Sequence, residues 1–151
     1  MIPKHLYREI ISVLPIICVD IVIRNKSGKV LLARRKNEPI KGHWWVIGGR
    51  ILSGESAHQA CIRKTFEETG LKINQLKFLG FYEDVYDKNA FDVPKPYHTL
   101  SLAFETQLSG DQVEEIIRLD SQHSDWGWFD ELPERFIISP QNKLFSKLDK
   151  K

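Results

Sequence analysis

Residues 48–71 read GGRILSGESAHQACIRKTFEETGL, and this stretch determines how the remaining segments are best interpreted. Ser56 is followed three residues later by Gln59, a spacing typical of a capping box at the start of a helix. Gly70 is typical of a helix end, because glycine adopts the left-handed conformation without steric cost. The pattern predicts a helix from Ser56 to Thr69, and the Gly-Gly pair before it permits close approach of the backbone to a ligand.

The charged residues near the end of this predicted helix pose a problem. Glu67 and Glu68 stand in the last turn, where the helix dipole disfavours carboxylates unless a cation offsets them. At about 100° per residue, Lys64 projects between the two glutamates, and Arg63 stands in ion-pair spacing with Glu67. One interpretation is a solvated, salt-bridged helix face. The other is a metal site that contains a built-in cation.

The segments on either side of this helix have mostly the pattern of strands. Residues 3–14 predict a short N-terminal helix, and Ser139-Pro140 predicts the start of a C-terminal helix. A turn at residues 26–28 predicts a hairpin between the first two of the β-rich runs, which stand at 16–25, 29–35, 44–49, 75–87, 97–108, 116–120 and 126–129. Strands around one central helix, with further helices at the ends, predict an α+β layered sandwich.

The composition limits the size and the partners of the protein. The chain has 151 residues, of which 42% are hydrophobic and 28% charged, and this predicts one domain spanning 1–151. The formal net charge of +2 is too small to favour a nucleic-acid or membrane surface. The apolar run from Ile10 to Ile23 contains Pro15 and Asp20, so neither a signal peptide nor a membrane span is expected. The two cysteines, far apart among apolar neighbours, favour a reducing, cytoplasmic setting.

The spacing within the opening stretch is specific. From Gly49 the chain reads a glycine, five residues, a glutamate, seven residues, an arginine, and then the run FEETGL after two more residues. This spacing resembles the Nudix box, the loop-helix-loop signature with which Nudix hydrolases bind a divalent metal and a diphosphate. The resemblance implies a Nudix-type α/β/α sandwich with a mixed central sheet. Lys64 and Thr65 depart from the pattern, because the family has a glutamate and then an aliphatic residue there.

A second segment offers a replacement for the missing glutamate. The run LDSQHSDWGWF places Gln122 and His123 just before a predicted strand. Taken alone, such a histidine is most often a surface residue. Beside the altered box, the segment resembles the Gln-His-Asp-Asp loop of GDP-mannose mannosyl hydrolases, a Nudix branch whose box also lacks the glutamate after the arginine. The resemblance covers about residues 16–129 and implies that His123 is the general base.

The same resemblance implies further site residues. Asp20 matches an aspartate of the first strand, and Arg35 matches an arginine that contacts the nucleotide phosphates. The run GHWWVIGGR matches the branch closely and ends in Arg50, which corresponds to an arginine that steadies the departing diphosphate. The branch has a leaving-group tyrosine near Thr99; this role is unfilled here, although Tyr97 and His98 stand close by as substrate-binding candidates.

The resemblance also implies a cofactor and a reaction. Gly48, Glu68 and Gln122, with Glu67 as an additional candidate, are expected to hold Mg²⁺, for which Mn²⁺ is a possible substitute. We expect hydrolysis of GDP-mannose or GDP-glucose to GDP and free sugar, by attack of water at the anomeric carbon with inversion. Lys64 is expected either to pair with Glu67 or to reach a phosphate.

Two alternative functions stay open at this point. An ordinary Nudix pyrophosphohydrolase would attack phosphorus, and the retained glutamate pair favours it. A non-catalytic nucleotide-binding regulator would explain the lost box glutamate. The branch forms homodimers, and Leu6, Ile10 and Ile11 on one side of the N-terminal helix predict an apolar face that either a partner subunit or the chain's own sheet could cover.

Overall fold

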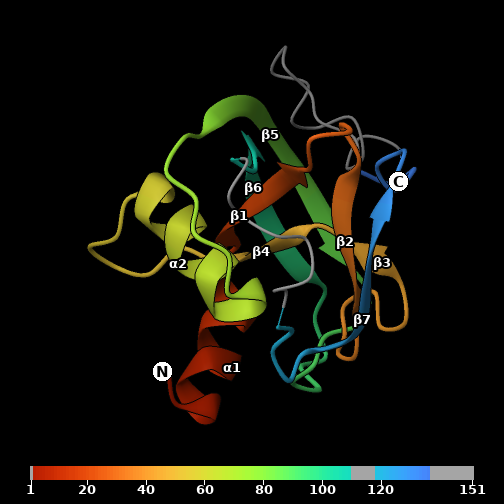
Figure 1. Ribbon diagram of the computed structural model, residues 1–151. Coiled ribbons are helices and arrows are strands. Elements are labelled where there is room, and N and C mark those ends of the chain that lie inside the picture. The colour runs from red at the N-terminus through yellow and green to blue at the C-terminus, as the bar shows by residue number, and fades with distance from the viewer. Residues whose placement is uncertain (1, 110–117, 137–151) are drawn as a thin grey trace.

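The computed structural model describes residues 2–109 and 118–136. The chain forms two helices and seven strands in these residues (Figure 1). In chain order they are α1 (Lys4–Val13), β1 (Ile16–Arg24), β2 (Val30–Arg35), β3 (Trp44–Trp45), β4 (Ile47–Arg50), α2 (Ala57–Thr69), β5 (Lys77–Tyr86), β6 (Tyr97–Gln107) and β7 (His123–Phe129).

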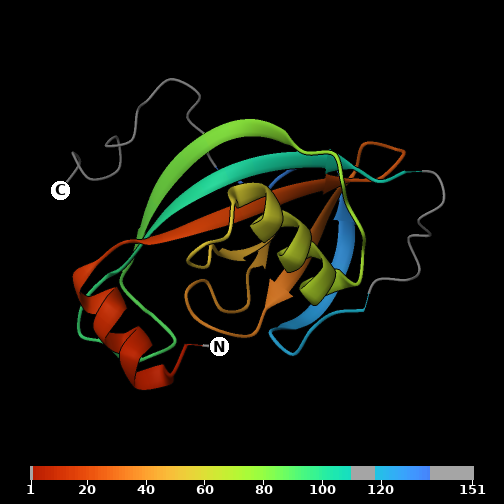
Figure 2. The ribbon, with the colours of Figure 1, turned by 90° about the vertical axis from the view of Figure 1, so that its left-hand side faces the viewer.

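The seven strands belong to one mixed sheet whose main path is β3-β2-β1-β6-β5. β6 pairs in parallel with the whole of β1, from Ile16 opposite Thr99 to Arg24 opposite Gln107, and all other pairings in the described residues are antiparallel. β4 pairs with β1, and β7 pairs with β2. The sheet curves over α2 (Figure 2). This arrangement confirms the predicted α+β class with a mixed central sheet.

Helix α2 forms as its sequence predicts. The Ser56 hydroxyl accepts a hydrogen bond from the Gln59 backbone N–H at 3.2 Å, and the Gln59 side chain accepts one from the Ser56 backbone N–H at 2.8 Å. Gly70 ends the helix in the left-handed conformation with φ of 75°. The helix buries Ala60 and Cys61 against core side chains of β1, β2, β4 and β6, and this packing fixes α2 on one face of the sheet.

The N-terminal helix packs on its own chain. Tyr7 and Ile11 of α1 are buried against Ile16 and Cys18 of β1, whereas Leu6 stays 43% exposed. Of the two ways to cover the predicted apolar face, the structure therefore uses packing on the chain's own sheet for much of it. No helix in the described part of the chain is long and apolar enough to cross a bilayer.

Three predicted elements differ from the structure or lie outside it. The run at 44–49 was predicted as one strand but forms β3 and β4, which pair with different partners, β2 and β1. The strand predicted at 116–120 is absent from its described part, residues 118–120, which dock on the end of α2 instead. Residues 116–117 and the predicted C-terminal helix lie outside the described residues.

Candidate active site

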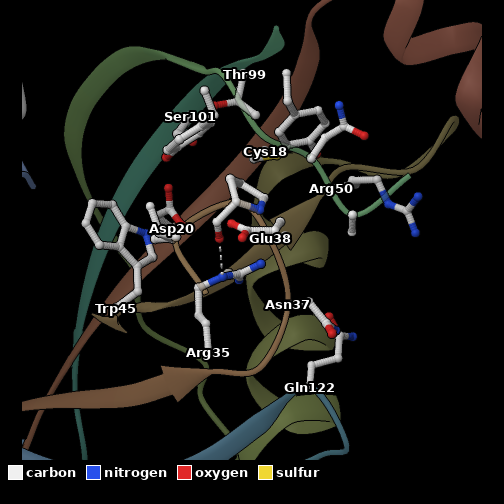
Figure 3. A pocket seen from close by; sticks show the side chains of 18 of the residues that line it. Cys18, Asp20, Arg35, Asn37, Glu38, Trp45, Arg50, Thr99, Ser101 and Gln122 are labelled. Carbon is white, nitrogen blue, oxygen red and sulfur yellow. Dashed lines mark hydrogen bonds between the residues drawn. The ribbon is translucent and has the colours of Figure 1, made fainter. Parts of the chain in front are cut away.

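A cavity of about 250 Å³ opens where the carboxyl end of α2 meets the sheet. Its wall contains residues from both helices, from strands β1 to β6 and from connecting loops. Figure 3 shows how side chains distant in sequence, among them Asp20, Arg35, Trp45 and Gln122, point toward a common space. Both charged and aromatic side chains line it, a combination suited to a ligand that is part anion and part ring.

Gly48 is required by the close contact between β4 and β1. It stands opposite Asp20 in the antiparallel register. A Cβ atom at position 48 would lie 2.4 Å from the Val19 carbonyl oxygen and 2.3 Å from Asp20 Oδ1. Only glycine therefore leaves this part of β4 tight against β1 at the cavity wall.

The inner pair, Lys64 and Glu68, shows which carboxylate the lysine of the box contacts. Lys64 Nζ lies 2.6 Å from Glu68 Oε1 and 3.6 Å from Glu67 Oε2, so its main partner is Glu68 rather than the predicted Glu67. The two side chains are 11% and 4% exposed, and both line the cavity. Burial raises the pKa of the Glu68 carboxyl, and the Lys64 ammonium opposes that rise because it favours the ionised form.

The outer network, Glu55, Arg63 and Glu67, lies on the neighbouring and more exposed side of the same helix. The Arg63 guanidinium donates to both oxygens of Glu55, at 2.6 and 2.8 Å, and to Glu67 at 3.1 Å. It also donates to the Arg50 carbonyl at 3.0 Å. The hydrogen bonds from Arg63 lower the pKa of Glu55. Glu67 is 49% exposed and does not line the cavity, so this structure does not bring it to the predicted metal ligands.

The two predicted arginines both reach the cavity, held in different ways. Arg35 donates from Nε to the Pro39 carbonyl at 3.1 Å (Figure 3). The Arg50 guanidinium lies 4.3 Å from the centre of the Tyr7 ring, a cation–π contact. Two fixed guanidinium groups in one cavity make it suitable for a bidentate anion such as a diphosphate.

Asp20 lies in the cavity wall as predicted, and its environment is unusual for a carboxylate. Tyr82 donates a short hydrogen bond to Asp20 Oδ2. Burial raises the pKa of Asp20, although hydrogen bonds from Tyr82 and Ser101 oppose this rise. The side chain is thus held in one orientation toward the cavity.

Gln122 belongs to a loop that docks on the end of α2, whereas His123, predicted to lie just before a strand, is the first residue of β7. The backbone N–H of Asp120 donates to the Glu68 carbonyl at 3.3 Å, which satisfies a free carbonyl of the last helical turn. The Asp120 carboxylate accepts from the Gln122 backbone N–H at 3.0 Å and contacts His123 Nδ1 at 2.8 Å. Gln122 lines the cavity, whereas the side chain of His123 is 3% exposed and is not among the lining residues.

Of the two remaining candidates on β6, one reaches the cavity. Tyr97 lines it together with Thr99 and Ser101, as expected for alternate residues of one strand. His98 lies on the opposite face of β6, where its Nε2 pairs with Glu83 of β5. Period-two alternation therefore separates His98 from the cavity, and this structure does not bring it to the site.

Several aromatic lining residues were missed by the sequence interpretation. Trp45, Tyr82, Tyr86 and Phe91 line the cavity, and Tyr7 of α1 joins them. Tyr7 shares a 3.0 Å hydrogen bond with Tyr97 and packs edge-on against Phe91 at 4.7 Å. The available signal was the period-two spacing of the tyrosines on β5, whereas the contribution of α1 depends on tertiary packing.

Cysteine chemistry is not supported at this site. Cys18 lines the cavity, but burial raises the pKa of its thiol to about 12. Cys61 is also free and buried, with its pKa raised to about 12. A nucleophilic cysteine needs a thiolate, so neither residue is suited to attack a substrate.

The donor chemistry of the cavity fits a hard divalent cation, although one donor already has a partner. Gly48, Glu68 and Gln122 line the same space and offer carbonyl, carboxylate and amide oxygens, the ligand types that Mg²⁺ prefers. Within residues 2–109 and 118–136, no three His, Cys, Asp or Glu side chains gather as a metal cluster. A cation here would therefore depend on few protein carboxylates, and Glu68 would have to be shared with Lys64 or released by it.

The fold and this cavity define a class of protein. The model of the NUDIX domain matches residues 14–136, and the chain belongs to this family. The recognition of the box as a Nudix signature is thereby confirmed. Divalent metals such as Mg²⁺ are general cofactors of Nudix hydrolases.

Particular relatives extend the comparison. The chain is 37% identical over 123 residues to the low-salt glycan biosynthesis protein Agl8 of Haloferax volcanii, covering 82% of this chain and 76% of that protein. It is 33% identical over 99 residues to an ADP-ribose pyrophosphatase of Methanocaldococcus jannaschii, covering 66% and 54%. Among solved structures, a MutT NUDIX hydrolase from Burkholderia pseudomallei aligns with a TM-score of 0.65 and 25% identity, covering 80% of this chain and 88% of that one.

Proposed function

We propose that this Nudix protein is a metal-dependent nucleotide-sugar hydrolase that acts on GDP-mannose or GDP-glucose. Water would attack the anomeric carbon, the C1–O bond would break, and GDP and a free sugar of inverted configuration would leave. The observation that carries the proposal is the composition of the cavity, which combines Gly48, Glu68 and Gln122 with two guanidinium groups and lacks the box glutamate.

The charged part of the cavity suits the diphosphate. Arg35 and Arg50 would bind the phosphate oxygens and neutralise the charge that accumulates on the departing diphosphate. Their fixed contacts to Pro39 and Tyr7 hold them before the substrate arrives. When bound, Mg²⁺ or Mn²⁺ would supply further charge neutralisation, with Gly48, Glu68 and Gln122 as its holders. For Glu67 and His98, roles at the site stay predictions.

The general base in this proposal is His123. Its Nδ1 faces the Asp120 carboxylate, which favours the tautomer with the proton on Nδ1 and leaves Nε2 to accept a proton from water. Asp120 also ties the loop to the end of α2, beside Glu68. Asp20, held by Tyr82, would orient the substrate from the opposite wall. His123 is 3% exposed and does not itself line the cavity, although it lies near Glu68, so the proposal requires water to reach Nε2 from beside Glu68.

The similarity to Agl8 supports a role for nucleotide sugars, because that relative is named for glycan biosynthesis and glycans are assembled from activated sugars. The aromatic residues Trp45, Tyr82 and Tyr86 provide faces on which a base or a sugar ring can stack.

The deciding experiment is hydrolysis of GDP-mannose with Mg²⁺ in ¹⁸O-labelled water, followed by mass spectrometry of both products. Attack at carbon places the label in the free sugar and leaves GDP unlabelled. Label in a nucleotide phosphate would overturn the proposal and support the ordinary pyrophosphohydrolase, an alternative favoured by the ADP-ribose pyrophosphatase relative. Binding of nucleotide sugars without any turnover across a substrate panel would instead identify a non-catalytic regulator.

We also propose that the protein is a homodimer in the cytoplasm. Leu6 of α1 is 43% exposed, and Leu14 just beyond the helix is 60% exposed, so apolar surface remains for a second subunit. Sedimentation at micromolar concentration should therefore give a species larger than 17.6 kDa. A single species at that mass would exclude the dimer.

A further inference from the structure

In the inner pair, the Lys64 ammonium binds the Glu68 carboxylate, which is also the strongest protein ligand that the cavity offers to a metal. Lys64 Nζ lies 2.6 Å from Glu68 Oε1, with the two side chains 11% and 4% exposed. The lysine arm runs past Gly49, where a Cβ atom would lie 2.6 Å from Lys64 Cε. Glycine at this position leaves room for the arm between α2 and β4.

This geometry has an electrostatic consequence for both states of the site. Without a cation, the buried Glu68 carboxylate would be an uncompensated charge, and Lys64 supplies the compensation. A divalent cation at the same carboxylate would meet the Lys64 ammonium at short range, and like charges repel strongly where solvent is excluded. Metal and lysine therefore compete for Glu68.

A bound diphosphate would resolve this competition. Lys64 lines the same cavity as Arg35 and Arg50. Lys64 is long and flexible, so its ammonium can move from a carboxylate to a phosphate without any movement of the backbone. A diphosphate in this cavity would give the ammonium a new anionic partner and leave Glu68 to the metal.

We propose that Lys64 is a resident counter-ion of the metal site: it holds Glu68 in the metal-free protein, competes with the divalent cation, and moves to the diphosphate, so that metal and diphosphate bind cooperatively. The diphosphate part of this inference rests on the proposed function. Lys64 is thus a positioning residue that acts through Glu68 and through the substrate.

The test is the affinity for Mn²⁺, measured by titration calorimetry with and without GDP, after the Mn²⁺–GDP equilibrium in buffer has been measured separately. The wild type should bind Mn²⁺ weakly alone and more tightly with GDP, by a factor within the 5–150-fold range typical of coupled sites. Lys64→Met should bind Mn²⁺ alone roughly tenfold more tightly and lose most of the coupling to GDP. Lys64→Arg, which keeps the charge, should retain weak binding of Mn²⁺ alone.

Lys77→Met is the matched control, because Lys77 is exposed at the start of β5 and does not line the cavity. This variant should keep both the wild-type Mn²⁺ affinity and the wild-type coupling. Equal or weaker Mn²⁺ binding by Lys64→Met, or wild-type coupling in that variant, would overturn the inference.

A second measurement follows the wild-type protein and needs a variant only to assign one resonance. In protein labelled at the lysine Cε atoms, the Lys64 resonance, identified by its loss in Lys64→Arg, should shift when Mg²⁺ and GDP are added together. A Lys64 resonance that saturating Mg²⁺ and GDP leave unchanged contradicts the inference. Coupled binding without turnover of any nucleotide sugar would reject the proposed function alone, whereas turnover with an indifferent Lys64 would reject this inference alone.

Discussion

The inner pair and the outer network lie on one helix, and their difference shows how a single motif serves two purposes. Glu67 and Glu68 are adjacent in sequence, yet their side chains are 49% and 4% exposed. Glu67 is bound by Arg63, which joins Glu55 and the Arg50 carbonyl and so ties the loop before α2 to the helix. Glu68 is bound by Lys64 at the cavity. The outer network thus joins the helix to the loop before it, and the inner pair faces the cavity.

The largest difference between the inner pair and the outer network is expected when each glutamate is replaced by glutamine. Glu68→Gln should abolish turnover at ordinary Mg²⁺ concentrations, because the carboxylate of the proposed metal site is lost. Glu67→Gln, the matched control, should change kcat/KM only a few-fold, since that side chain does not line the cavity. Steady-state kinetics with GDP-mannose measures both. Equal losses in the two variants would show that the inner and outer faces are not functionally distinct.

The proposed general base, His123 at the start of β7, gives the next largest expected effect. His123→Gln should lower kcat by roughly 10²–10⁴-fold, the usual contribution of a positioned base, while leaving Mn²⁺ affinity nearly intact. Adding Lys64→Glu, which restores the usual box sequence, should not rescue this variant, because the new carboxylate would lie on the phosphate side of the substrate. Stopped-time product assays measure kcat, and calorimetry measures metal affinity. A loss of metal affinity as large as the loss of kcat would indicate a structural role for His123.

Local sequence signals predicted much of the fold and several site residues, whereas the remaining features depend on tertiary contacts. The capping box, the left-handed Gly70 and the apolar strand runs are local signals, and they predicted α2 and most strands correctly. Sequence spacing placed Lys64 between the two glutamates but suggested Glu67 rather than Glu68 as its partner, because the choice depends on which side of α2 is buried. His98 was assigned by nearness in sequence, although alternation along β6 places it opposite Tyr97.

The outer network should affect stability more than chemistry. Arg63→Ala removes a two-pronged contact to Glu55, whose side chain is 14% exposed, together with the bond to the Arg50 carbonyl. We expect a loss of about 1–3 kcal/mol in the free energy of unfolding, as is usual for charged hydrogen bonds in partly buried positions. Urea unfolding followed by circular dichroism measures this loss. An unchanged unfolding midpoint would mean that the network contributes nothing to the shape of the box.

The smallest effect concerns the pH dependence of stability. Burial raises the pKa of Asp20 above its ordinary value of 3.8, so the folded state keeps this proton at pH values where the unfolded state has lost it. The stability contribution of Asp20 is therefore complete below about pH 4 and declines as pH rises toward the folded-state pKa. Relative to Asp20→Asn, the wild type should lose at most about 1.4 kcal/mol per pH unit in this range.

Urea unfolding of both proteins at a series of pH values measures this difference. Glu131→Gln, at an exposed site, serves as the control and should give a profile parallel to that of the wild type. Parallel profiles for Asp20→Asn and the wild type would contradict the raised pKa of Asp20.

The contribution of α1 to the cavity bears on how this protein could have diverged from its relatives. The family match begins at residue 14, whereas Tyr7 touches both Arg50 and Tyr97 at the cavity. A segment outside the matched domain therefore forms part of the cavity wall. If the cavity is the binding site, exchange of this short segment between homologues should alter ligand preference while every residue of the box stays the same. Specificity could then evolve through the N-terminal segment without any change in the box.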